Sequence, residues 1–246
     1  MYYSLIAISL LLMPQESFKA SQLKKARVKA AYDEKEKVIQ AYFEKKGLSY
    51  NGFHLFIRAF KKEGVLEAWV RNKGETTYSL LQTYAFCATS GVLGPKRREG
   101  DLQIPEGVYH VNHFNPESTY HLSLGVSYPN KSDRILGDPE YPGSAIYIHG
   151  NCVTIGCIPI TDGKIKELYL MSVEARNNGQ TNIPIHIYPF RMDPPTFESV
   201  SKNASDNVVS FWKNLKPVFE DFERSRQVRI VTVDSKGEYL LSKELL

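Results

Sequence analysis

Residues 146–160 read "IYIHGNCVTIGCIPI", and this stretch decides how the chain is interpreted. A β-branched, apolar run leads into His149, and a short loop then carries Cys152 and Cys157. Three kinds of site are open for these side chains: a disulfide between the two cysteines, a metal site, or a catalytic histidine–cysteine pair. The pattern of the flanking segments has to distinguish them.

The segments on both sides of this stretch alternate between apolar and polar residues with a period of two, which predicts β-strands. We expect strands at 53–60, 65–71, 77–86, 105–114, 119–126, 144–150 and 183–190. Between the last two, residues with helical periodicity predict a helix, with Asp162 as its cap and Gly179 as its stop. The predicted fold class is mainly β (α+β): a β-sandwich-like core with an inserted helix and flanking N- and C-terminal helices.

The two ends of the chain differ from the core. Residues 1–20 predict a signal peptide, because their apolar run from Leu5 to Met13 is about as long as a signal-peptide h-region and too short to cross a bilayer. Residues 21–47 have apolar side chains at helical spacing and predict an N-terminal helix. Residues 48–192 form the predicted core domain. Residues 193–246 predict a Pro- and Ser-rich linker, a helix broken or restarted at Pro217, and a hairpin, all packed on the core.

Composition and charge restrict the class of partner. The 246 residues are 42% hydrophobic and 24% charged, as in an ordinary globular protein with a sizeable core. The formal net charge of +4 suits an acidic polymer or a carboxylate-bearing substrate. No basic run continues along one face, so we expect no nucleic-acid partner.

The chain has three cysteines, an odd number for a protein expected to be exported. At least one thiol must therefore remain unpaired or pair between chains. An unpaired thiol is a liability in an oxidising compartment, so this count indicates that one cysteine has a function.

The surroundings of the two loop cysteines favour Cys157 as the functional one. His149 ends an apolar strand, which places its ring on rigid structure, and Gly150 then allows close backbone approach. Gly156 leaves the approach to the Cys157 sulfur open and lets backbone N–H groups converge there. The eight-residue separation allows the loop to fold back and bring the histidine and the thiol within hydrogen-bond reach. Cys152 has no preceding glycine.

Two other interpretations remain open from the residues alone. A Cys152–Cys157 disulfide is geometrically possible, and Cys87 would then be the free thiol. A zinc site would need these two cysteines, the loop histidine and a fourth ligand. The candidates for that ligand are His110, His113 and His121. The spacing matches no familiar zinc pattern, so we expect no metal and no cofactor.

The stretch "IHG" followed by "TIGC" resembles the active-site signature of the YkuD-type L,D-transpeptidases, and its short spacing resembles the YafK-like branch of murein L,D-transpeptidases and endopeptidases. Further segments carry the resemblance from about residue 52 to residue 239. They are "SGVLGPKRREGDLQIPEGVYHV", "NPESTYHLSLGVSYPNKSDR", "GKIKELYLM", "IPIHIYPFRM" and "FWKNLKPVFEDFE".

This resemblance implies an L,D-transpeptidase catalytic domain at 48–192 that acts on peptidoglycan stem peptides through a cysteine acyl-enzyme at the L-centre of diaminopimelate. It implies Cys157 as the nucleophile and His149 as the general base. The backbone carbonyl of Gly150 would orient the imidazole, and the amides of Gly156 and Cys157 would bind the oxyanion. One departure is Ile155, which stands where the broader family has a second histidine, so His149 alone would carry the base role.

The matching segments also suggest residues that contact the carboxylates of the substrate. They are Arg98, Asp101, Tyr120, His121 and Arg134. Cys152 is expected to shape or pack the loop, with regulation through a disulfide as the alternative.

The expected partners are peptidoglycan stem peptides, with a wall-linked protein as a further candidate, and the expected location is the periplasm or cell envelope. We expect no stable membrane insertion after signal cleavage. The acyl group could pass to an amine, giving a cross-link, or to water, giving hydrolysis. Two further hypotheses are a non-catalytic peptidoglycan-binding module on the same scaffold and a structural disulfide protein.

Overall fold

The structure is a computed structural model that describes residues 16–246. Its helices are α1 Phe18–Leu23, α2 Ala26–Lys45, α3 Lys131–Leu136, α4 Asp162–Asn177, α5 Pro194–Ser201 and α6 Asp206–Ser225. Its strands are β1 Phe53–Phe60, β2 Val65–Asn72, β3 Ser79–Ala85, β4 Gly107–Asn115, β5 Ser123–Val126, β6 Tyr147–His149, β7 Ile158–Pro159, β8 Pro184–Tyr188, β9 Arg229–Val233 and β10 Tyr239–Leu245.

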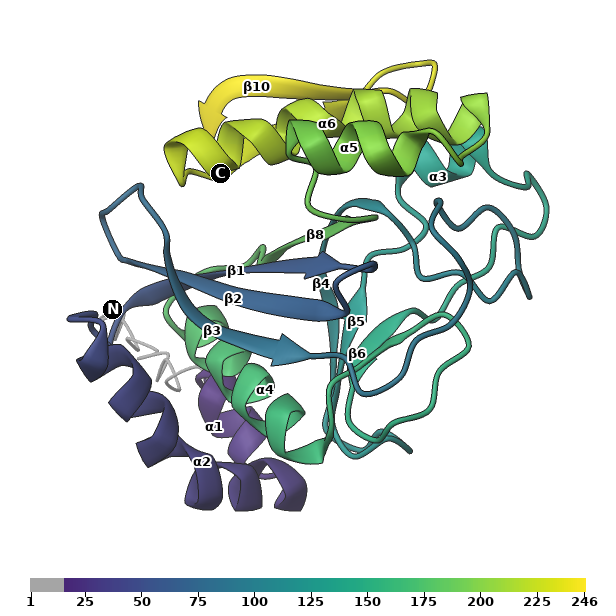
Figure 1. Cartoon of the computed structure of the whole chain (residues 1–246). Coiled ribbons are helices and arrows are strands. Elements are labelled where there is room, and N and C mark those ends of the chain that lie inside the picture. The colour runs from purple at the N-terminus through teal and green to yellow at the C-terminus, as the bar shows by residue number, and fades with distance from the viewer. Residues whose placement is uncertain (1–15) are drawn as a thin grey trace, which may run out of the picture.

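Eight strands form one curled sheet in the order β3-β2-β1-β8-β4-β5-β6-β7, and β9 and β10 form a separate hairpin. Helices α1, α2 and α4 cover one face of the sheet, and α5, α6 and the hairpin cover the other (Figure 1). Most pairs are antiparallel, but β1–β8 and β6–β7 are parallel. The parallel β6–β7 pair matters most for the site, because these two strands flank the histidine–cysteine loop.

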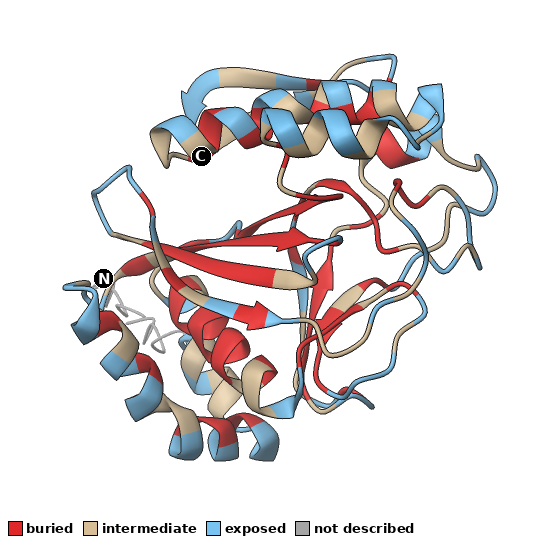
Figure 2. Ribbon diagram, viewed as in Figure 1, coloured by how far each residue is buried: buried red, intermediate tan, exposed pale blue. Residues whose placement is uncertain are grey.

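Strand β1 is buried on both faces, which explains its nearly continuous apolar sequence. Leu55, Ile57 and Ala59 face the core that α2 and α4 complete. Phe56 and Phe60 face the opposite side, where they meet aromatic residues of α6. Figure 2 shows the result as a band of buried residues through the sheet and α4, with exposed residues on the outer helices. The alternation of the strand thus divides the interior into two cores.

The predicted α+β class is confirmed, with α4 as the inserted helix and further helices towards both ends of the chain. The predicted sandwich-like core takes the form of one strongly curled sheet. Each predicted strand has a counterpart, although the predicted strand at 144–150 is reduced to the three residues of β6.

The C-terminal segment differs from prediction in two places. The predicted linker contains α5, which begins after Asp193, whose side chain accepts the Thr196 N–H at 3.2 Å. Helix α6 runs without interruption through Pro217. Pro217 lies on the exposed side of this helix. The helix continues because its opposite, apolar face, which includes Leu215 and Phe219, packs on the sheet.

The predicted N-terminal helix is divided into α1 and α2, and it starts earlier than expected, at Phe18. Residues 1–15 of the predicted signal peptide lie outside the described residues. Within the described part of that segment, Phe18 stacks edge-on against Phe114 at 4.9 Å, and Lys19 pairs with Glu174 at 2.6 Å. The range 1–20 predicted for the signal peptide therefore ends within α1. Among residues 16–246, no helix has the length and apolar character that a membrane crossing requires.

A buried arginine joins the sheet to the C-terminal layer. Arg58 of β1 has no exposed surface, and its Nη1 lies 2.7 Å from Glu223 of α6 and 3.7 Å from Glu67 of β2. Its guanidinium also lies over aromatic rings, with centroids 4.7 Å away in Phe222 and 4.9 Å away in Phe60. The charge therefore has both acidic partners and ring faces in place of water.

We expect Arg58→Ala to lower the free energy of unfolding by about 3–5 kcal/mol, because it leaves buried Glu67 without this cation and opens a cavity among the rings. Denaturant unfolding monitored by tryptophan fluorescence measures the change. Lys202→Ala is the control, since its pair with Glu198 is highly exposed and should contribute less than about 1 kcal/mol. Equal losses in both variants would contradict a role for Arg58 in joining the layers.

Candidate active site

The parallel pairing of β6 with β7 brings the segments of His149 and Cys157 side by side. The register pairs Ile148 with Ile158 and His149 with Pro159. Cys157 is the residue just before β7, and the Tyr147 backbone N–H donates to it. Side chains two residues apart on a strand share a face, so a register extended by one residue would put Cys157 on the same face as His149.

His149 is held in one tautomer by its neighbour. Its Nδ1 lies 2.5 Å from the carbonyl oxygen of Gly150. A carbonyl oxygen can only accept, so Nδ1 carries the proton and Nε2 is left as the proton acceptor. The contact is the one that the role predicted for the Gly150 carbonyl requires, and the role itself stays a prediction.

The His149 ring is also shielded from water. Its side chain is almost wholly buried, and the Tyr120 ring stacks on it with a centroid distance of 4.6 Å and an angle of 28°. Burial lowers the pKa of His149 below its usual value, against the opposing effect of the Gly150 hydrogen bond. The imidazole is therefore neutral, and ready to accept a proton, at neutral pH.

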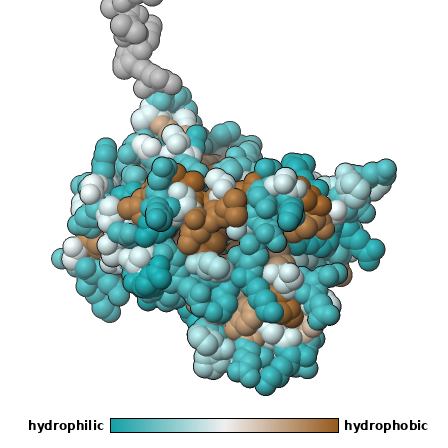
Figure 3. Space-filling model, turned by 90° about the horizontal axis from the view of Figure 1, so that it is seen from above, coloured by the Kyte–Doolittle hydropathy of each residue, from teal (hydrophilic) through white to brown (hydrophobic). Residues whose placement is uncertain are grey.

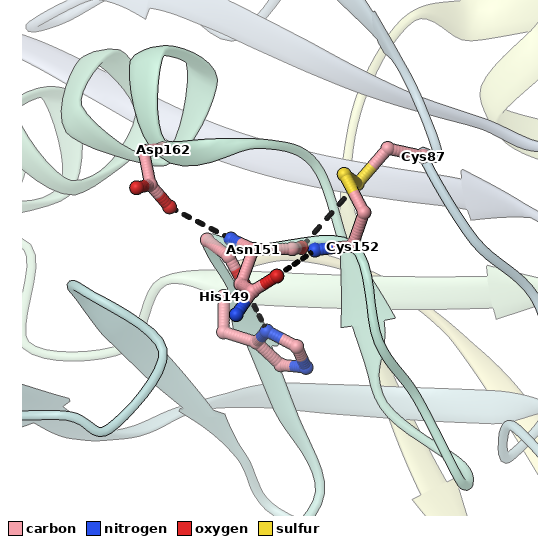
Figure 4. The surroundings of a disulfide bond; sticks show 6 residues. Cys87, His149, Asn151, Cys152 and Asp162 are labelled. Atoms are coloured by element: carbon pink, nitrogen blue, oxygen red, sulfur yellow. Dashed lines mark hydrogen bonds between the residues drawn. A yellow bond between two sulfur atoms is a disulfide. The ribbon is translucent and has the colours of Figure 1, made fainter.

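The loop after the histidine is closed by a disulfide between Cys87 and Cys152, whose Cα atoms lie 5.2 Å apart (Figure 4). This bond excludes one open alternative, the Cys152–Cys157 bridge. It also corrects the expectation that Cys152 only shapes or packs the loop, because Cys152 is covalently tied to the segment that follows β3. The free thiol is Cys157, not Cys87. With its sulfur in the disulfide, Cys152 is also unavailable as a ligand in the zinc arrangement.

Thr154 organises the turn that carries Cys157. Its Oγ1 accepts the N–H groups of Gly156 at 3.1 Å and Cys157 at 2.8 Å, and its hydroxyl donates to the Cys157 carbonyl at 2.8 Å. Both amides are therefore occupied in the free protein, and the oxyanion role expected for them stays a prediction. They become available only if the Thr154 hydroxyl turns away.

Gly156 is required by the backbone at this turn. Its φ is +135°, in a region that side-chain-bearing residues rarely adopt, and a Cβ there would lie 3.0 Å from the carbonyl oxygen of Gln103. The following Cys157 is half-buried, with its sulfur 3.7 Å from the Ala145 carbonyl oxygen. Among the described contacts, no hydrogen bond joins this sulfur to His149.

Burial raises the pKa of the Cys157 thiol, and this effect outweighs a hydrogen bond from the Tyr147 backbone and the charge of Lys96, which both lower it. Since the pKa of His149 is lowered, the resting pair is a neutral thiol and a neutral imidazole. Such a pair suits attack in which the imidazole takes the proton as the sulfur reaches the substrate carbonyl.

The predicted substrate contacts have different surroundings. Tyr120 lies on His149, and the exposed Arg98 has no recorded partner for its side chain among the described residues. His121 has a φ of +71°, and its Nε2 is buried without a recorded hydrogen bond. Exposed Arg134 lies on α3, and no recorded contact brings it to the histidine or the thiol.

Asp101 is a correction among these residues. One of its oxygens accepts from Lys96 Nζ at 2.5 Å and from the Gln103 N–H at 3.0 Å. The other accepts from the backbone N–H groups of Arg97 and Arg98 at 2.9 and 3.0 Å. The carboxylate therefore shapes the 94–104 loop and is not free for a ligand.

Apolar side chains gather in separate patches on the face that carries α5, α6 and the hairpin (Figure 3). A cleft of about 590 Å³ lies between the loop at 92–97, α3, α6 and the β9–β10 turn. Neither His149 nor Cys157 lines it, so the site is identified by its chemistry rather than by the size of a cavity.

Comparison with known proteins gives a consistent result along the sequence. The YkuD family model, described as an L,D-transpeptidase catalytic domain, matches residues 56–187. The Escherichia coli K12 protein named "Putative L,D-transpeptidase YafK" is 39% identical over 196 residues, which cover 79% of this chain and 76% of that protein. The protein of the same name from strain O157:H7 gives the same values.

Two solved structures are more distant. The helical cell shape determining protein Pgp2 from Campylobacter jejuni aligns with a TM-score of 0.45 and 16% identity, covering 76% of this chain and 74% of that one. L,D-transpeptidase 1 from Mycobacterium tuberculosis aligns with a TM-score of 0.31 and 16% identity, covering 56% and 63%. At these values the structural alignments add nothing to the sequence relationship.

We expect the double variant Cys87→Ser/Cys152→Ser to lose about 2–4 kcal/mol of unfolding free energy, because the disulfide closes a long loop across 65 positions. Denaturant unfolding measures the loss, and reduced wild-type protein should resemble the variant. Unchanged unfolding free energy in both would contradict a stabilising bond between Cys87 and Cys152.

We expect alkylation of Cys157 by iodoacetamide to accelerate with pH beyond the ordinary thiol pKa of about 8.5, because burial raises its own pKa and only the thiolate reacts. Mass spectrometry of the native protein follows the rate, with glutathione as the reference thiol. A rate that levels off near pH 7 would instead indicate a preformed thiolate–imidazolium pair.

Proposed function

Because the chain belongs to the YkuD-type L,D-transpeptidase family, we propose that it is an exported cysteine acyltransferase that acts on peptidoglycan stem peptides. Cys157 is the nucleophile and His149 the general base. The observation that carries this proposal is the hydrogen bond from His149 Nδ1 to the Gly150 carbonyl, since it leaves Nε2 basic on the face that bears the free thiol.

The chemistry proceeds in two halves. His149 Nε2 takes the Cys157 proton as the sulfur attacks the amide carbonyl at the L-centre of diaminopimelate. The tetrahedral intermediate collapses, the C–N bond breaks, and the imidazolium gives its proton to the leaving D-amino acid. A thioester remains on Cys157. An amine or water, deprotonated by His149, then attacks the thioester and returns the thiol.

The oxyanion of these intermediates needs donors, and Thr154 controls the two nearest candidates. The Gly156 and Cys157 amides bind the Thr154 hydroxyl in the free protein. We propose that substrate binding turns this hydroxyl aside, so that the amides exchange one oxygen acceptor for another without exposing an unpaired N–H.

Charge around the site agrees with an acidic peptide as substrate. Buried Lys96 lies close enough to Cys157 to lower the thiol pKa, and the exposed guanidinium of Arg98 lies on the same loop. Lys96 is already paired with Asp101, so Arg98 is the cation that we expect to bind a carboxylate of the stem peptide. The Cys87–Cys152 disulfide supports an oxidising compartment such as the periplasm.

We expect Cys157→Ala to abolish release of the terminal D-amino acid from a diaminopimelate-containing tetrapeptide muropeptide, because no second thiol can replace it. His149→Ala should reduce turnover by about 10²–10⁴-fold, the usual contribution of a general base. Chromatography with mass spectrometry quantifies the products, with and without an acceptor stem peptide, and so separates hydrolysis from cross-linking.

His110→Ala provides the control, because His110 lies exposed on β4 and outside the proposed machinery. Its turnover should equal that of the wild type. Full activity of Cys157→Ala would overturn the proposal. Binding of muropeptides by wild-type protein without turnover would support the non-catalytic binding module instead.

A further inference from the structure

We propose that Asp162 positions His149 through the peptide group between Gly150 and Asn151, forming a carboxylate–peptide–imidazole relay. This inference deepens the proposed function, on which its catalytic consequence rests. Asp162 is the first residue of α4, and the sequence pattern predicts for it only the cap of that helix.

The relay consists of two hydrogen bonds on one peptide group (Figure 4). The N–H of Asn151 donates to Asp162 Oδ1 at 2.7 Å. The carbonyl oxygen of the same peptide, contributed by Gly150, accepts from His149 Nδ1 at 2.5 Å. The N–H and C=O of a trans peptide point in opposite directions, so the carboxylate lies at one end of the peptide dipole and the imidazole at the other.

The carboxylate acts on the imidazole by polarising this peptide. A charged acceptor at the N–H shifts electron density toward the carbonyl oxygen, and hydrogen bonds in such a chain strengthen one another. The stronger acceptor holds the proton on Nδ1, fixes the orientation of the ring, and stabilises the imidazolium that forms when the thiol loses its proton. An aspartate in a serine–histidine–aspartate triad has the same effect by direct contact.

The loop is built around this contact. A Cβ at Gly150 would lie 2.5 Å from Asp162 Oδ1 and 2.9 Å from the Tyr120 carbonyl oxygen, so position 150 admits only glycine while the carboxylate remains there. Asn151 adopts a φ of +62°, in the left-handed region that few residues other than glycine, asparagine and aspartate adopt. Its own side chain accepts the Cys152 N–H at 2.6 Å.

Asp162 is not used as the helix cap. The cap position belongs to Thr161, which has a φ of +66° and makes no side-chain capping bond. The Asp162 carboxylate instead points back to the loop before the nucleophile. The Asp162 charge also acts on His121. The pKa of His121 is lowered overall, chiefly by burial, and the Asp162 charge opposes this effect.

An acidic residue in the first turn of a helix also stabilises that helix, so the test must separate the two effects. Asp162→Ala removes both the acceptor and the charge, whereas Asp162→Asn retains an oxygen acceptor without the charge. Asp206→Ala is the matched control, because Asp206 is the first residue of α6, is exposed, and lies outside the described site contacts.

The first readout is the ¹⁵N–¹H spectrum of the His149 imidazole in histidine-labelled protein, with the signals of His149 and His121 separately assigned. We expect the Nδ1–H tautomer in wild type and in Asp206→Ala. Asp162→Ala should show a mixture of tautomers and an upfield shift of the Nδ1 proton, and Asp162→Asn an intermediate shift.

The second readout is turnover of the tetrapeptide muropeptide. We expect kcat to fall by about 10–100-fold in Asp162→Ala, with KM nearly unchanged, and by less in Asp162→Asn. A folded Asp162→Ala with wild-type tautomer and wild-type kcat would overturn the relay, as would a loss of kcat with an unchanged spectrum. If Asp162→Ala does not fold, unchanged spectrum and kcat in Asp162→Asn would overturn it equally.

The two readouts also distinguish this inference from the proposed function. The spectrum tests the relay even if no stem peptide is turned over, in which case only the proposed function fails. Loss of the tautomer preference in Asp162→Ala would then still support the relay.

Discussion

The hydrogen bond from His149 Nδ1 to the Gly150 carbonyl is the interaction on which the proposed chemistry of this protein depends. It selects the tautomer that can accept a proton from a thiol, without a carboxylate in direct contact with the ring. A backbone carbonyl can perform this role only if the loop that presents it is rigid. The fold supplies that rigidity from separate parts of the chain, because Asp162 of α4 holds the Asn151 N–H and Cys87 holds Cys152.

Burial gives the site its second property, a neutral resting state. The His149 ring lies beneath Tyr120, and its pKa is lowered, while the pKa of the half-buried Cys157 thiol is raised. A charged thiolate–imidazolium pair would be costly to desolvate here. In the proposed mechanism the pair separates charge only when a substrate carbonyl receives it, as expected of a general base rather than of a preformed nucleophilic ion pair.

The sequence was sufficient for the features that depend on local pattern. The strand before His149 and the glycine before Cys157 follow from residues within one stretch, and family membership agrees with them. The Cys87–Cys152 disulfide does not, because the connectivity of three cysteines spread over the chain depends on how the sheet brings them together.

Two missed features did have local signals. A hydroxyl three residues before Cys157 is a known turn-forming pattern, and "DPP" at residues 193–195 is typical of a helix start. Asp162 shows the opposite case, in which an ordinary helix-capping pattern conceals a tertiary contact.

The most direct test of the account is to identify the covalent intermediate. Wild-type protein is mixed with a diaminopimelate-containing tetrapeptide, quenched with acid and mapped by peptide mass spectrometry. The account predicts that the peptide containing Cys157 gains the acyl group of the substrate without its terminal D-amino acid. Release of that D-amino acid with no adduct on Cys157 at any quench time, or with the adduct on another residue, would contradict it.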